Sequence, residues 1–160
     1  MKLLAVAAFL VAVQTPTLVA PAVVFDHIDS VKPVDAFAHL PPGIRSGSFM
    51  VDNTPAKGWV MSEPGGPFQA TDVVTPGSPL PGRRMIFAAC DATVCLLHYE
   101  RGGIAHVYEV LAFKSGSNGW SVVWNARGPK PLANLAALKA MVKHTASAGG
   151  WTNEWVPGNF

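Results

Sequence analysis

The chain has 160 residues, of which 49% are hydrophobic and 14% charged, and its formal net charge at pH 7 is +2. This length suits a single domain with a modest core. A net charge so close to zero gives no electrostatic reason to expect nucleic acid or an acidic membrane surface as a partner.

The first residues have the three parts of a secretory signal peptide. Lys2 supplies the positive charge, Leu3–Val13 is an uncharged apolar run, and Ala20 and Ala22 are small residues spaced as a signal peptidase requires. The apolar run is too short to span a bilayer, which takes about 20 residues. We therefore predict that residues 1–22 are a signal peptide that is cleaved after Ala22.

A buried N-terminal helix is the alternative, but polar residues and a proline at positions 14–16 interrupt the apolar run. The sequence then predicts one mature domain, residues 23–160, with a loop-rich part (23–82) and a β-rich part (83–160). No later stretch is long and apolar enough to predict a membrane helix. We expect the protein to be secreted or periplasmic.

The two cysteines, Cys90 and Cys95, are separated by four residues. In an exported chain this spacing predicts a local disulfide. A metal site would need further ligands, and a redox-active pair is usually spaced Cys-x-x-Cys at the start of a helix. The sequence therefore predicts a structural disulfide and no metal site.

The loop-rich part contains prolines and glycines that interrupt every apolar stretch. Proline removes a donor from the hydrogen-bond ladder of a sheet, and glycine weakens strand interiors. We predict only short edge strands here, at Gly47–Val51 and Gly58–Met61.

The β-rich part contains four runs of Val, Ile, Tyr, Phe and Trp separated by turn residues, which predict an antiparallel meander over about 85–125. The predicted strands are Met85–Cys90, Val94–Glu100, Ile104–Phe113 and Trp120–Asn125.

A helix is predicted at about 131–146, because Leu132, Leu135, Leu138 and Val142 form one apolar stripe. A helix packed on a meander is an α+β fold. The tail that follows carries Trp151 and Trp155, which we expect to cover an edge of the core, with an aromatic anchor for a partner as the alternative.

The Gly102–Gly103 doublet predicts a two-residue hairpin turn, which would place Tyr99 opposite His106. Alternation along the strands then puts His98, Glu100 and Glu109 on one face. A histidine with two carboxylates there could act as an acid–base pair or as part of a metal site. The alternative, which we favour, is that these polar residues are solvated or merely structural.

The same register puts Tyr99, His106 and Tyr108 together on the other face. This cluster either caps the edge of the core or forms a binding patch for a ligand or partner.

The sequence contains no Gly-x-Ser-x-Gly, His-x-x-x-His or Gly-x-Gly-x-x-Gly pattern, so no cofactor is predicted. Two function classes remain. The first is a non-enzymatic module that binds a protein or envelope component, such as an inhibitor, through Tyr99, His106, Tyr108, Trp151 and Trp155. The alternative is a small hydrolase or metal-dependent enzyme that uses His98 with Glu100 or Glu109. We favour the binding module.

Overall fold

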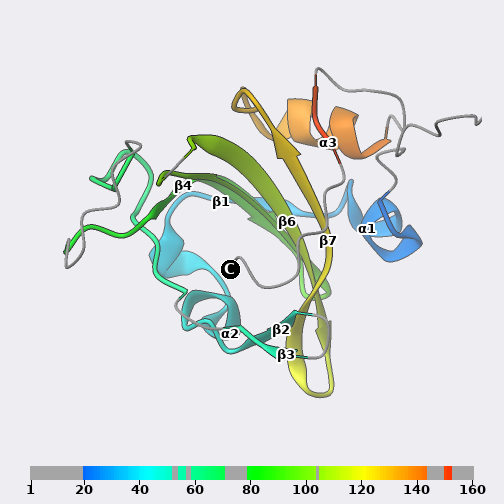
Figure 1. Ribbon diagram of the computed structural model, residues 1–160. Helices are drawn as coiled ribbons and strands as arrows, with labels where there is room; N and C mark the ends of the chain where they lie inside the picture. Colours follow the sequence, from blue (N-terminus) through cyan, green and yellow to red (C-terminus); the bar gives the residue numbers. More distant parts are fainter. Residues whose placement is uncertain are drawn as a thin grey trace, which may run out of the picture.

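A computed structural model of the chain shows a mixed α+β protein in which one curved sheet lies between helices and loops (Figure 1). The predicted fold class is therefore confirmed. The structure describes residues 20–51, 54–56, 59–70, 79–103, 105–143 and 150–152. The predicted signal peptide, apart from its last three residues, lies outside these ranges.

The centre of the sheet is the meander that the sequence predicts. Four consecutive strands pair antiparallel, each with the next. They are β4 (Arg83–Cys90), β5 (Val94–Arg101), β6 (Val107–Gly116) and β7 (Gly119–Gly128).

The prediction of four strands is too low, because the described residues form a sheet of seven, in the order β1-β4-β5-β6-β7-β2-β3. At one edge β1 (Lys32–Val34) pairs with β4, and at the other β2 (Phe49–Val51) runs parallel to β7 and pairs with β3 (Thr54–Pro55). The short strand predicted near Gly47–Val51 is thus present as β2. Trp59–Met61, the described part of the other predicted edge strand, forms no strand. The edge strands are short because proline and glycine limit them.

Two short helices and a 3-10 turn in the loop-rich part were not predicted. They are α1 (Ala22–His27), η1 (Phe37–His39) and α2 (Pro42–Arg45). The carbonyl of Pro21 accepts hydrogen bonds from the amides of Val24 and Phe25 at 2.9 and 3.1 Å, which starts α1. The predicted cleavage point after Ala22 coincides with the first residue of this helix.

The C-terminal helix, α3 (Leu135–Lys143), begins later than the sequence predicts. Asn134 caps it, because its side-chain Oδ1 accepts a hydrogen bond from the Ala137 amide at 3.0 Å. Leu132, which was predicted to be helical, precedes α3, and its amide donates a hydrogen bond to His98 Nε2. The last three predicted residues, 144–146, lie outside the described ranges.

Both faces of the sheet are covered, which the sequence did not predict. Helices α1 and α3 lie on one side of the curved sheet, and α2 lies on the other (Figure 1). Strand β5 is buried along nearly its whole length. The solvated part of the favoured expectation is therefore wrong, since His98, Glu100 and Glu109 are only 0%, 6% and 7% exposed, whereas a structural role for them stays a prediction.

Each face has its own hydrophobic core. We call the first the helix-side core, which includes Val24, Ile28, Leu96, Val110, Leu138, Met141 and Trp151. We call the second the loop-side core, which includes Ile44, Phe49, Trp59, Leu97, Tyr99, Leu111 and Phe113. Because successive residues of β5 pack into opposite cores, its first four residues, Val94 to Leu97, are all apolar.

The pairing predicted for β5 and β6 is wrong by three residues. Arg101 pairs with Val107, and Tyr99 pairs with Glu109 instead of His106. The glycine doublet begins a longer loop: the Gly102 amide donates to the Gly82 carbonyl at 3.0 Å. A Cβ on Gly102 would lie 1.8 Å from the Gln69 carbonyl oxygen, so this glycine permits a close backbone approach.

Because the shift is an odd number of residues, each side chain of β6 lies on the opposite face of the sheet from the one predicted. His106 and Tyr108 now lie on the face of His98 and Glu100, whereas Glu109 lies on the face of Tyr99. None of the cross-strand pairs that the predicted register gave for β5 and β6 is therefore present in the described pairing.

The predicted disulfide is present. Cys90 and Cys95 are paired across β4 and β5 and are bonded to each other. They bracket the turn that contains Asp91. Within the part of the chain that the structure describes, no helix has the length and apolarity needed to cross a membrane.

Candidate functional site

Glu109 lies on the loop side of the sheet and is held by two arginines. Its Oε1 accepts hydrogen bonds from Arg101 Nη2 at 2.9 Å, and from Arg127 Nε and Nη2 at 3.1 and 2.8 Å. Its Oε2 accepts a hydrogen bond from the hydroxyl of Tyr99. Burial, together with the charge and the hydrogen bond of Glu109, raises the pKa of Tyr99 well above its ordinary value. Both oxygens of this buried carboxylate are thus engaged within the domain.

Glu100 lies on the helix side and contacts β4 and the loop that precedes β6. Its Oε1 accepts from Arg84 Nε at 2.7 Å, and its Oε2 lies 2.8 Å from His106 Nε2. The Arg84 guanidinium lies 4.4 Å from the ring centre of Phe68 and also donates to the Gly66 carbonyl at 3.1 Å. Glu100 therefore positions one arginine and one histidine at the hairpin end of the sheet.

His98 is occupied at both ring nitrogens. Its Nδ1 lies 2.9 Å from the main-chain carbonyl of Glu109, and its Nε2 lies 3.0 Å from the amide nitrogen of Leu132. A carbonyl only accepts and an amide only donates, so Nδ1 carries the proton and Nε2 the lone pair. His98 thus bonds to the main chain of Glu109, not to its carboxylate.

Burial lowers the pKa of His98 from 6.5 to about 4, against the opposing effects of the Glu109 carbonyl and the Glu100 charge. Below pH 6.5 the unfolded chain takes up a proton that the folded chain refuses until about pH 4. We expect the free energy of unfolding to fall by about 3 kcal/mol over this interval, at about 1.4 kcal/mol per pH unit.

This loss of stability is measured by urea unfolding at pH 7, 5.5 and 4, with His98→Gln as the matched variant. Glutamine does not titrate, so its curve should lack this component of the pH dependence. Equal slopes for the two proteins between pH 6.5 and 4 would contradict the assignment.

The predicted binding residues are distributed over three places. Tyr99 lies in the loop-side core and contacts Glu109. His106 and Tyr108 lie together, with ring centres 5.0 Å apart, and the His106 side chain is 37% exposed. Trp151 is buried against His98, with ring centres 5.7 Å apart. Trp155 lies outside the described residues.

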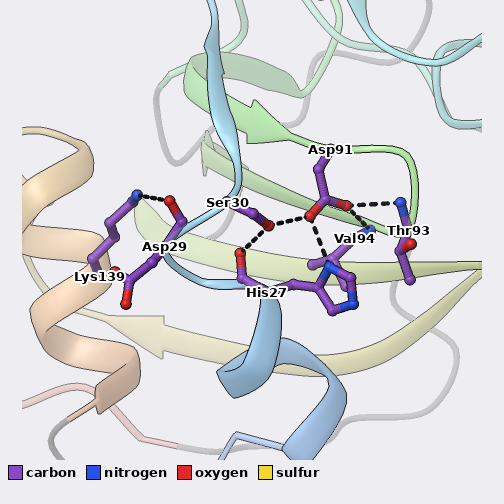
Figure 2. Close-up of polar contacts among 7 residues, drawn as sticks. All are labelled: His27, Asp29, Ser30, Asp91, Thr93, Val94 and Lys139. Carbon is purple, nitrogen blue, oxygen red and sulfur yellow. Dashed lines mark hydrogen bonds and ion pairs between the residues drawn. The ribbon is translucent and has the colours of Figure 1, made fainter.

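A further polar cluster, which the sequence analysis missed, ties α1 to the disulfide-bracketed turn (Figure 2). Oδ2 of Asp91 lies 2.8 Å from His27 Nδ1 and accepts a hydrogen bond from Ser30 Oγ. Its Oδ1 accepts from the amides of Thr93 and Val94, each at 2.7 Å. The sequence analysis did not single out His27, whose partner is 64 residues away. The sequence signal that could have indicated part of this cluster is Asp91 itself, because an aspartate at the start of a tight turn commonly accepts hydrogen bonds from the turn amides.

The pKa of Asp91 is held below its ordinary range. Burial raises it, but hydrogen bonds from Ser30, the Val94 amide, His27 and the Thr93 amide together outweigh that effect. The carboxylate therefore stays ionised and fixes the end of α1 on the turn.

Replacing Asp91 with alanine should lower the free energy of unfolding by about 2 kcal/mol, because two turn amides and Ser30 lose their acceptor. Thermal unfolding monitored by circular dichroism measures the change. Asp26→Ala, an exposed aspartate of the same helix α1, is the control and should change stability by less than about 0.5 kcal/mol. Equal effects of the two substitutions would refute the role of Asp91.

Among the residues described, no group of three histidine, cysteine or acidic side chains is arranged to hold a metal ion. Comparison with known proteins gives no match, either to a family model, to a curated protein or to a solved structure.

Proposed function

We propose that this chain is an exported binding module whose ligand surface is built around His106 and Tyr108. Export is supported by the predicted signal peptide and by the disulfide, which is typical of oxidising compartments. The proposed partner is a protein or another envelope component, as for a small inhibitor of a secreted enzyme.

We define the hairpin-end surface as the exposed His106 and the half-buried Arg84 and Tyr108, together with the buried Phe68 and Glu100 beneath them. Its rings contact one another in a row, since His106 lies 5.9 Å from Phe68 and 5.0 Å from Tyr108 between ring centres. Arg84 and Glu100 neutralise each other beside these rings. Aromatic side chains with an arginine are the residues most enriched in the energetically important centres of protein interfaces.

The observation that carries this proposal is that His98 and Glu109, the candidate catalytic residues, are already hydrogen-bonded within the domain. Both nitrogens of His98 are hydrogen-bonded to the main chain, and the Glu109 carboxylate is bound by two arginines and a tyrosine. Such groups stabilise the fold, because their hydrogen-bonding atoms already have partners within the domain. His106, by contrast, is positioned by Glu100 and is accessible.

The contact between His106 and Glu100 favours one catalytic alternative, in which His106 and not His98 is the catalytic histidine. A carboxylate only accepts, so Glu100 places the proton of a neutral His106 on Nε2 and leaves the lone pair on Nδ1. A carboxylate that orients an accessible imidazole is the arrangement of a general base. Hydrolysis of p-nitrophenyl acetate that disappears in both His106→Ala and Glu100→Gln would support this alternative.

The binding proposal is tested with a photo-reactive benzoylphenylalanine at position 108, irradiated in the extracytoplasmic fraction of the producing cell. The matched control carries the same group at Val60, which is 59% exposed and outside the hairpin-end surface. We expect a discrete cross-linked product from position 108 only, and its loss when His106→Ala is added. Identical products from both positions, or none from position 108, would overturn the proposal.

A further inference from the structure

A second site lies at the edge of the sheet, beside β1. A pocket of about 340 Å³ opens there between β1, β4 and the start of α3. The lining residues that matter here are Val34, Asp35, Ile86, Phe87, Ala133 and Leu135. Its walls are mostly apolar, and its volume is at the lower end of the range for ligand pockets, about 300 to 1,000 Å³.

Among the described residues, the edge of β4 has no strand partner where this pocket lies. β1 pairs with β4 only as far as Ala88, opposite Val34. Further along, Ser62 exchanges hydrogen bonds with the Arg83 carbonyl and the Met85 amide, at 2.9 and 3.0 Å. Between these two contacts, no described strand pairs with Ile86 and Phe87 on this edge.

The strand is also irregular at this point. The pairing of β4 with β5 shifts between Met85 and Phe87, which is a β-bulge. Bulges bend a strand and redirect its backbone groups, and they are common beside binding sites. An exposed strand edge of this kind pairs with an extended peptide through main-chain hydrogen bonds.

Of the described residues that line the pocket, Asp35 is the one with a charged side chain. Its side chain is 86% exposed, and its Oδ1 lies 2.8 Å from His39 Nδ1. Because the remaining lining is neutral, the charge at the mouth of the pocket favours a cationic group on the ligand.

We propose that this pocket binds the amino-terminal residue of a peptide. The apolar side chain of that residue enters between Phe87 and Leu135, and its main chain runs along Ile86 and Phe87. Its ammonium group lies near Asp35. The apolar side chain, the main-chain amide and the ammonium group of such a residue match the apolar lining, the strand edge and the Asp35 carboxylate, respectively. The site is separate from the hairpin-end surface.

Three small probes separate these contributions: leucyl-glycine amide, its N-acetylated form, and glycyl-glycine amide. Binding is followed by the amide chemical shifts of ¹⁵N-labelled protein at millimolar probe concentrations. We expect leucyl-glycine amide to shift the signals of Val34, Phe87 and Leu135. Acetylation, which removes the ammonium charge, should weaken binding by about two- to fivefold, as expected for an exposed ion pair. Glycyl-glycine amide, which has no side chain, should not bind.

Three variants complete the test. Ala133→Phe should block the pocket and abolish binding, and Asp35→Asn should remove the preference for the free amine over the acetylated probe. Asp26→Asn, an exposed aspartate away from the pocket, is the matched control and should bind as the unmodified protein does.

The proposal is overturned if leucyl-glycine amide shifts no signal near the pocket, or if Ala133→Phe binds it as well as the unmodified protein. It also fails if the acetylated probe binds equally well. None of these outcomes bears on cross-linking from position 108, so the two sites are tested independently.

Discussion

Glu109→Ala should lower the free energy of unfolding by about 3–5 kcal/mol, the cost of breaking a buried ion pair from one side. The carboxylate is 7% exposed and accepts hydrogen bonds from Arg101, Arg127 and Tyr99. Without it, two partly buried guanidinium groups face each other across β6 with no negative charge between them. Urea unfolding at pH 7 measures the loss.

Tyr99→Phe is the matched comparison, because it removes one hydrogen bond to the same carboxylate and keeps the ring. We expect it to cost about 1–2 kcal/mol, since the charge on Glu109 remains paired with the arginines. If Glu109→Ala costs no more than Tyr99→Phe, the arginines do not depend on Glu109 and the proposed network is wrong.

His98→Ala should be the second large effect, at about 3–4 kcal/mol. The ring is 0% exposed, and it packs edge-on against Phe87 and Trp151, at 5.0 and 5.7 Å between ring centres. Its removal leaves a cavity in the helix-side core and takes the acceptor from the Leu132 amide. The segment that leads into α3 should therefore loosen as well.

Two measurements distinguish this structural role from a catalytic one. Thermal unfolding should show a large loss for His98→Ala and a loss below about 1 kcal/mol for the exposed His106→Ala. Hydrogen exchange of the Leu132 amide should accelerate in His98→Ala and be largely restored in His98→Gln, whose amide can both donate and accept. A stable His98→Ala protein with a protected Leu132 amide would refute the assignment.

The two predictions bear on function because they assign His98 and Glu109 to the fold. The function proposed here is located elsewhere on the hairpin, at His106 and Tyr108. These two residues were already candidates from the sequence, but they were grouped with the wrong neighbours. Their actual neighbours are Glu100, Arg84 and Phe68.

The sequence by itself determined the parts of this protein that depend on local chemistry. β-branched and aromatic runs between turn residues specify the four central strands, and an apolar stripe at helical spacing specifies α3. The spacing of Cys90 and Cys95 specifies the disulfide, because two cysteines that flank a short turn lie opposite each other in adjacent strands.

The tertiary structure alone decided the register of the hairpin and the burial of its polar residues. Gly102 permits a two-residue turn, but it is instead used where the backbone of Gln69 passes over it, which lengthens the loop. That contact joins residues far apart in the sequence, and no local pattern encodes it. Because side chains alternate at every residue of a strand, this one displacement moved Glu109 away from the side chain of His98. The helices and loops that bury both faces likewise come from the two ends of the chain, so only the folded chain shows which polar groups remain accessible.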